Sequence, residues 1–231
     1  IYENVADPLH VGYGYLSDGL IQEGESVSHM PDAPVGSIKV KDLNGWLKDE
    51  EGDFILDEEG NKQLSGIPDD VIDDADKVII HNRAPKLSFG FNNTLFYKGF
   101  DLSFFFYGEI GRQLNNVTRM DFLRADKYRF GDNVTTDAFD KWSSSNPDGK
   151  YPSGLFPRYE NNTDFYIEDA DFFRLKNLTL GYTIPNGFAN GLFKNSRIFV
   201  DVQNLFVWTN YTGSDPETEG NTDNTYSVYP N

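Results

Sequence analysis

The stretch YIEDADFFRLKNLTLGYTIP, residues 166–185, decides the fold of this chain. Its apolar residues recur at every second position, but their parity changes midway: Phe173 and Leu175 first, then Leu178, Leu180, Tyr182 and Ile184. A period of two is typical of a β-strand with one apolar face. The change of parity indicates a bulge near Lys176 and Asn177, because one extra residue moves the following side chains to the other parity. The stretch therefore predicts one long, kinked strand.

Three other stretches alternate in the same way. Residues 87–97 and 101–110 flank a tight turn at Lys98 and Gly99, which predicts a long antiparallel hairpin over residues 86–111. Residues 197–209 alternate until the phase shifts at Leu205. A short connection joins them to the opening stretch, so we expect a second hairpin over residues 166–211.

The composition excludes several classes of protein. The chain has 231 residues, no cysteine, 15% aromatic residues and a net charge of −17. The absence of cysteine excludes disulfides and thiolate metal sites, and the charge argues against nucleic acid, which needs basic surfaces. There is no run of about 18 apolar residues, which excludes a transmembrane helix but leaves short, alternating membrane strands open.

The negative charge is concentrated between Asp42 and Asp76, where thirteen residues are acidic and two are basic. So dense a run predicts a solvated loop, with a hairpin near residues 53–64. Carboxylate oxygens are also the ligands that calcium prefers. EF-hand spacing from Asp49 fails because Phe54 stands where glycine is required. Five aspartates remain weak calcium candidates beside the solvated-loop interpretation: Asp69, Asp70, Asp73, Asp74 and Asp76.

Nothing in the sequence indicates catalysis or a cofactor. His10, His29 and His81 are scattered without zinc-ligand spacing. No carboxylate pair stands out with the aromatic sugar platforms that a glycosidase would need. Residues 112–165 lack a period apart from a short helix predicted at residues 135–142, with Thr136 or Asp137 as its N-cap. So long a connection is typical of a functional or interacting loop.

The strands are about ten to twelve residues long, close to the nine to eleven that cross a bilayer when tilted. In a membrane barrel, the aromatic residues near the strand ends would form the girdle at the lipid headgroups: Tyr97, Phe100, Tyr182, Trp208 and Tyr211. The polar face would line the lumen or contact ligand through Asp101, Glu109, Arg174, Arg197, Asp201 and Gln203. Arg174 either contacts ligand or plug, or pairs with Asp169 and Asp171. A soluble β-sandwich with its apolar face inward stays open on periodicity alone.

Four landmarks in order resemble one family. Residues 84–111, APKLSFGFNNTLFYKGFDLSFFFYGEIG, and the opening stretch are similar to strands of SusC/RagA-like TonB-dependent outer-membrane transporters. RIFVDVQNLFVWTNYTGSDPE at 197–217 resembles their "QNL...T.Y.G.DPE" pattern, and GYGYLSDGLIQ with VGSIKVKDLNG resembles their upstream motifs. The chain departs from the family by an insertion between Gly45 and Asp73.

The resemblance implies an all-β fold: the C-terminal strands of an antiparallel transmembrane barrel of about 22 strands, plugged in the whole protein. The five parts expected are 1–85, short strands and a long acidic extracellular loop; 86–111, a hairpin; 112–165, a long extracellular loop; 166–211, a hairpin; and 212–231, an extracellular loop before a missing last strand. We expect the plug domain to be absent from these residues as well.

The resemblance also implies a function. Such a protein imports glycan or peptide oligomers across the outer membrane of a Gram-negative cell. It contacts lipid, engages TonB through its N-terminal plug and works with a SusD-like surface lipoprotein. It is not an enzyme, needs no cofactor and binds no nucleic acid. The alternative is a soluble, secreted β-sandwich that serves as an adhesin or glycan-binding module.

Overall fold

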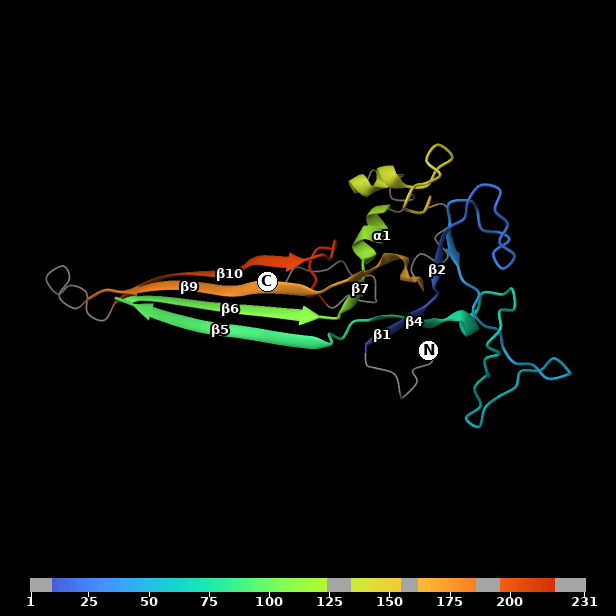
Figure 1. The fold of residues 1–231 in the computed structure, drawn as a ribbon, viewed down its shortest axis with the longest axis horizontal. Helices are drawn as coiled ribbons and strands as arrows, with labels where there is room; N and C mark the ends of the chain where they lie inside the picture. The colour runs from blue at the N-terminus through green and yellow to red at the C-terminus, as the bar shows by residue number, and fades with distance from the viewer. Residues whose placement is uncertain (1–9, 124–133, 155–161, 186–195, 219–231) are drawn as a thin grey trace.

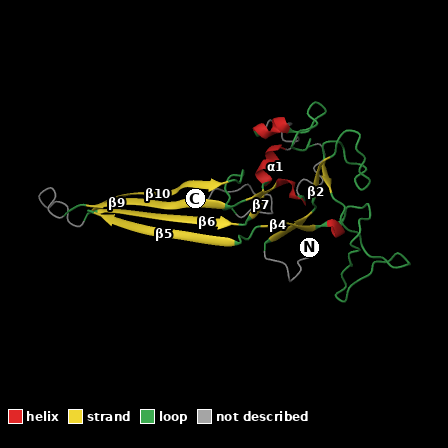
Figure 2. Cartoon of the chain, in the orientation of Figure 1, coloured by secondary structure: helices red, strands yellow, loops and turns green. Residues whose placement is uncertain are grey.

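The computed structural model describes residues 10–123, 134–154, 162–185 and 196–218. Its largest element is a four-stranded antiparallel sheet in the order β10–β9–β6–β5 (Figures 1 and 2). The strands are β5 (Leu87–Tyr97), β6 (Phe100–Ile110), β9 (Phe172–Thr183) and β10 (Arg197–Thr209). Both predicted strand pairings, β5 with β6 and β9 with β10, are therefore confirmed. The connection at residues 186–195 lies outside the described residues.

The turn between β5 and β6 is as tight as the sequence predicts. Tyr97 pairs with Phe100, so Lys98 and Gly99 alone connect the strands. Both have positive φ, 46° and 86°, as the two central residues of a type I′ turn require. This turn matches the right-handed twist of the flanking strands, and it fixes the register of all eleven residue pairs between β5 and β6.

The predicted bulge is also present. Phe105 pairs with Asn177 but Phe106 pairs with Leu175, so Lys176 is the extra residue on β9. On β10, Asn204 and Leu205 stand in the corresponding gap, and Asn204 has a positive φ of 49°. The bulge keeps the apolar residues before and after it on one face of the sheet.

As a result, the sheet has one apolar and one polar face. The cross-strand rows Leu95–Leu102–Leu180–Val200 and Tyr97–Phe100–Tyr182–Ile198 belong to the apolar face. Phe173 stacks there between Phe106 and Trp208, with ring centroids 5.0 and 5.4 Å apart. Many of these side chains are exposed, including Leu95, Leu180 and Val200. No described element covers this face.

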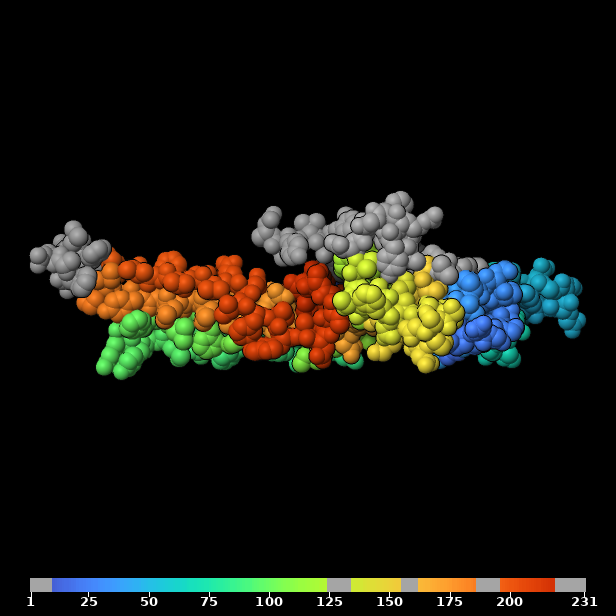
Figure 3. Space-filling model, turned by 90° about the horizontal axis from the view of Figure 1, so that it is seen from above, coloured from blue at the N-terminus to red at the C-terminus, as the bar shows by residue number. Residues whose placement is uncertain are grey.

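The remaining elements lie at one end of the sheet, where β6 and β10 finish and β5 and β9 begin (Figure 1). We call it the loop end, and the opposite end the turn end. The loop end contains three two-stranded sheets: β1 (Val11–Gly14) with β4 (Val78–Asn82), β2 (Ser17–Leu20) with β3 (Ile38–Val40), and β7 (Gln113–Asn115) with β8 (Ile167–Asp169). Seen from above, sheet and loop end form one elongated body (Figure 3).

The loop end has its own core. α1 (Val117–Leu123) contributes Met120 and Leu123, which pack with buried residues of β3 and of the segments that connect the other elements: Tyr15, Ile21, Met30, Ile38, Val40 and Tyr166. Three 3-10 helices complete it: η1 (Asp74–Asp76), η2 (Thr136–Asp140) and η4 (Asp164–Tyr166). Among the described residues, no helix has the length and apolar character needed to cross a membrane.

Several local expectations for the loop end need correction. Residues 112–165 contain α1 and β7, which the sequence did not predict. The expected helix near residue 137 is the 3-10 helix η2, and its N-cap is Thr135, whose side chain accepts from the Asp137 amide. In the acidic run, Leu56 and Lys62 form an isolated antiparallel bridge, consistent with the expected turn.

Candidate functional site

The six predicted lumen-facing residues share the polar face of the sheet. The register places Asp101 beside Gly181, Glu109 beside Phe172, and Tyr107 beside Arg174. The same face carries the three predicted residues of β10: Arg197, Asp201 and Gln203. The structure thus brings these side chains onto one surface, although they come from three strands, β6, β9 and β10, and from positions 101 to 203 of the sequence.

Toward the turn end, the charged groups of this face have hydrogen-bond partners on other strands. Arg197 donates from Nε to Asp101 Oδ1 at 2.9 Å, across two strand intervals. Asp201 accepts from Asn177 Nδ2 at 2.9 Å and from the Thr179 hydroxyl. This half of the face is therefore a polar wall in which Arg197 and Asp101 form an ion pair and Asp201 accepts from neutral donors.

Toward the loop end, Arg174 does not pair as expected. Its Nη2 lies 2.5 Å from Asp215 Oδ1, and its Nε lies 3.2 Å from Glu217 Oε2. Asp171, an expected partner, accepts instead from the Gly111 amide at 2.7 Å. Asp169 lies 3.5 Å from Gln113 Nε2. Of the two alternatives for Arg174, pairing with Asp169 and Asp171 is wrong, because residues 215–217 return over the polar face and offer better placed carboxylates.

Two more cations hold the returning segment, residues 215–218. Lys176, the bulged residue, forms an ion pair with Glu217. Arg112, which is buried, donates from Nη2 to the Thr218 carbonyl at 2.8 Å and from Nη1 to Glu109 at 3.0 Å. The cations at this end of the face are thus already partnered by the chain's own carboxylates and carbonyls.

Glu168 is the centre of a second polar network, next to the returning segment. It accepts from Asn116 Nδ2 at 3.0 Å, Arg119 Nη1 at 3.1 Å and the Thr212 amide at 2.8 Å. Burial raises the pKa of Glu168, but the hydrogen bonds from Thr212, Asn116 and Arg119 outweigh it and hold the pKa below its usual value. The network ties α1, β8 and residue 212 together.

Arg119 extends this network to η2. It donates from Nε to Asp137 Oδ2 at 3.0 Å and also contacts the Tyr151 hydroxyl. Burial raises the pKa of Tyr151, partly offset by the Arg119 charge. Sequence reasoning missed this group. One signal was present: Asn116 precedes the helix, and its Oδ1 caps α1 by accepting from the Arg119 amide at 2.9 Å.

The five predicted girdle residues differ in their exposure and in their position on the sheet. Tyr97 and Phe100 are exposed at the turn end, where Phe100 packs on Tyr182 with ring centroids 4.6 Å apart. Trp208 is exposed near the loop end. Tyr211 is turned inward, and burial raises its pKa to about 12, with the charge of Glu168 adding to the rise. Four of the five therefore lie on the sheet surface near its ends.

The five calcium candidates do not meet at one point. Asp73 and Asp76 form a capping box at η1, and Asp76 is fully buried while accepting from the amides of Leu43 and Asn44. Asp74 pairs with Lys77 at 2.6 Å. Within the described ranges, the one group of three or more potential metal ligands is His29, Asp42 and Asp70.

Comparisons with known proteins identify what the chain resembles. It is 32% identical to TonB-dependent receptor P3 of Formosa agariphila over 95% of this chain and 20% of that protein. It is 29% identical to TonB-dependent receptor SusC of Bacteroides thetaiotaomicron over 90% of this chain and 20% of that protein. No protein-family model matches. The chain thus spans about a fifth of the length of these relatives.

The fold has solved counterparts. The structure of the RagAB peptide transporter superposes with a TM-score of 0.59 at 22% sequence identity, over 91% of this chain and 20% of the other. The same importer in its closed-closed state gives a TM-score of 0.57 over 90% of this chain. Both the expected resemblance and the expected antiparallel all-β fold are confirmed.

Proposed function

We propose that this chain, which has the sequence and fold of a segment of the SusC/RagA-like TonB-dependent receptors, forms part of the wall and outer loops of a nutrient importer in the outer membrane. The whole protein would carry oligomers of glycan or peptide inward, driven through TonB and its plug. A SusD-like surface lipoprotein would cover the loop end. In this proposal the chain binds and guides cargo and catalyses no reaction.

The observation that carries the proposal is the sheet with one apolar and one polar face, at one end of which the other described elements lie (Figure 1). β5 and β6 have 11 residues each, about 36 Å at roughly 3.3 Å per residue. A tilt of about 45° reduces this to about 25 Å, the height of the apolar band in outer-membrane barrels. An exposed apolar face on strands of this length fits lipid better than water.

The open edges of the sheet support the same proposal. Among the described strands, β5 pairs only with β6, and β10 pairs only with β9. Unpaired edges of long strands are aggregation sites in a soluble protein, and closure into a barrel removes them. The remainder of a receptor five times as long would supply the neighbouring strands. The β-sandwich alternative lacks a second described sheet packed on the apolar face.

The polar face suits a hydrated passage. Its charges are largely paired within the chain, as Arg197 with Asp101 and Arg174 with Asp215. A wall with balanced charges and many hydrogen-bonding groups can border a neutral or mixed-charge oligomer without holding one charge type tightly. This property favours neither glycan nor peptide, so both substrate classes remain in the proposal.

The experiment is a deletion of the gene for the whole protein. The mutant should lose growth on one class of oligomer while retaining growth on the corresponding monomer, and the gene in trans should restore growth. A tonB deletion is the matched control and should give the same loss. The whole protein should sediment with outer membranes and co-purify with a surface lipoprotein. Recovery of the folded protein in the soluble fraction would overturn the proposal.

A further inference from the structure

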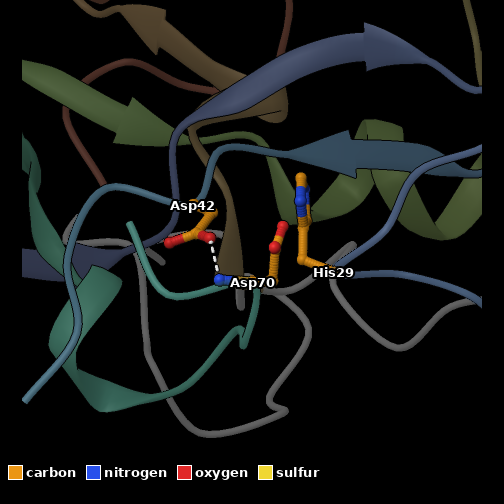
Figure 4. Close-up of side chains that lie close together, drawn as sticks. All are labelled: His29, Asp42 and Asp70. Atoms are coloured by element: carbon orange, nitrogen blue, oxygen red, sulfur yellow. Dashed lines mark hydrogen bonds between the residues drawn. The ribbon is translucent and has the colours of Figure 1, made fainter. Parts of the chain in front are cut away.

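Three potential metal ligands from separate parts of the chain meet at the base of the acidic run (Figure 4). His29 lies in the loop between β2 and β3, Asp42 follows β3, and Asp70 precedes η1. One ligand atom from each lies within 4.8 Å of those of the other two. The fold therefore creates an arrangement that no local spacing in the sequence indicates.

The imidazole of His29 is oriented by a group outside this trio. Its Nε2 lies 2.9 Å from the Val40 carbonyl oxygen. A carbonyl oxygen can only accept, so Nε2 donates and, in the neutral ring, Nδ1 carries the lone pair. Metal-binding histidines are typically held in this way, with one ring nitrogen donating to a backbone carbonyl and the other facing the metal.

The two carboxylates carry negative charge without a cationic partner. No ion pair between residues of the described ranges includes Asp42 or Asp70. Asp42 instead accepts from the Asp70 amide at 2.6 Å, and Asp70 Oδ1 accepts from the Ser28 hydroxyl at 2.7 Å. Two carboxylates so close repel each other in the ionised state. A divalent cation between them would remove this repulsion.

We propose that His29, Asp42 and Asp70 bind a divalent transition-metal ion of the Zn²⁺ type. One imidazole nitrogen with two carboxylate oxygens suits Zn²⁺ and its neighbours, whereas Ca²⁺ takes six to eight oxygen ligands and Mg²⁺ prefers oxygen and water. Three protein ligands leave the fourth position of a tetrahedral ion to water. This site differs from the five-aspartate calcium candidate, with which it shares Asp70 alone.

The position of the site indicates its role. Asp42 and Asp70 stand at the two ends of residues 43–69 in the acidic run, and His29, whose ring is bonded to the Val40 carbonyl, lies beside both. The hydrogen bond from the Asp70 amide to Asp42 already joins the two ends of this segment. An ion there would add a stronger link at the same place, and such a link reduces the conformational entropy of the unfolded segment. The proposed site is therefore structural, and it does not depend on the transport function.

The test uses the full-length protein purified in detergent and stripped of metal with a chelator. Calorimetric titration with ZnCl₂ should reveal a saturable site with one ion per chain. His29→Asn and Asp70→Asn should each weaken that site at least about tenfold, since loss of even an outer partner of a metal ligand costs 10–100-fold. Titration with CaCl₂ should leave it unfilled.

Asp69→Asn is the matched control. It removes the same charge one residue away, but the Asp69 carboxylate accepts from the Val71 amide and is outside the trio. It should leave Zn²⁺ affinity within about twofold of wild type, far less than the loss of a ligand costs. Equal weakening by Asp69→Asn and Asp70→Asn, or no effect of His29→Asn, would overturn the proposal.

A second measurement uses only the wild-type protein, so it does not depend on whether a variant folds. The stripped wild-type protein loaded with Co²⁺ should show visible absorption of a four- or five-coordinate ion, and one equivalent of Zn²⁺ should abolish it. Absence of such absorption would overturn the site even if a variant failed to fold.

Discussion

Arg174 Nη2 and Asp215 Oδ1 lie 2.5 Å apart although 41 residues separate them in sequence. Through this contact the returning segment, residues 215–218, is held on the polar face of the sheet. Arg174 is 8% exposed, so water screens the pair weakly. The segment therefore occupies part of the surface that the sequence assigned to ligand.

Replacement of Arg174 with Met should weaken the attachment of the returning segment, which Lys176 and Arg112 would still contact. Asp215 and Glu217 would lose their shared cation, and we expect a loss of about 1–3 kcal/mol, below the 3–5 kcal/mol of a fully buried pair because both carboxylates are partly exposed. Thermal unfolding in detergent and protease cleavage within residues 212–218 would measure it. Lys150→Met is the control. Its pair with Asp140 spans 3.8 Å and Lys150 is 78% exposed, so the change should be near zero. Equal effects would contradict the role of Arg174.

Acid should loosen the loop end through Glu168. Its folded pKa lies below the ordinary 4.5, so its contribution is fully present above about pH 4.5 and is lost as pH falls through the folded value. The protection of α1 and β8 amides against hydrogen exchange, relative to the intrinsic rate at each pH, should therefore fall below pH 4.5. Glu168→Gln should remove that fall and lower the protection at neutral pH. The exposed Glu58→Gln serves as control, and an unchanged pH profile in Glu168→Gln would contradict this assignment.

The sequence predicted the sheet well because the evidence for it is local. Alternating side chains in β5, β6, β9 and β10 reflect a period that each strand carries by itself, and the parity change at Lys176 shows the bulge without reference to neighbours. By contrast, α1 has only seven residues and two buried apolar positions, Met120 and Leu123. Such a short helix depends on tertiary packing, and the periodicity of the sequence does not reveal that packing.

The contacts of the candidate site were harder to predict, because they depend on which loops return to which surface. Arg174 stood close in sequence to two aspartates, yet its partners come from beyond β10. His29 looked isolated in sequence, and only the pairing of β2 with β3 and the return of residue 70 place it beside two carboxylates. The residue type indicated the chemistry of each side chain, but the fold determined which other residues that side chain contacts.

The type I′ turn between β5 and β6 predicts opposite effects on stability for substitutions at its two central residues. Gly99→Ala places a Cβ on a residue with φ of 86° and about 3.3 Å from the Thr183 carbonyl oxygen, and should cost about 1–2 kcal/mol. Lys98→Asn should be neutral or slightly stabilising, because asparagine adopts positive φ more readily and Asn-Gly is the preferred pair here. The midpoint of thermal unfolding in detergent compares the two. A loss of stability in Lys98→Asn equal to that in Gly99→Ala would argue against this turn.

Two neighbouring residues of β10 distinguish lipid from water around the sheet. Val200 on the apolar face and Phe199 on the polar face are similarly exposed, at 64% and 58%. In a bilayer, Val200→Arg should destabilise the full-length protein by about 1–3 kcal/mol, because Val200 is two residues from Ile198 in the girdle row, and the cost of arginine on a lipid face falls from about 2–4 kcal/mol at the midplane to about 0–1 near the interfaces. Phe199→Arg should cost much less, because its side chain faces the hydrated side. Urea titration in lipid vesicles, followed by tryptophan fluorescence, measures both. In a soluble sheet the two arginines would be tolerated alike, since both positions already meet water. A common effect of the two variants would therefore argue against the membrane assignment, whereas a large difference would identify the Val200 face as the one in contact with lipid.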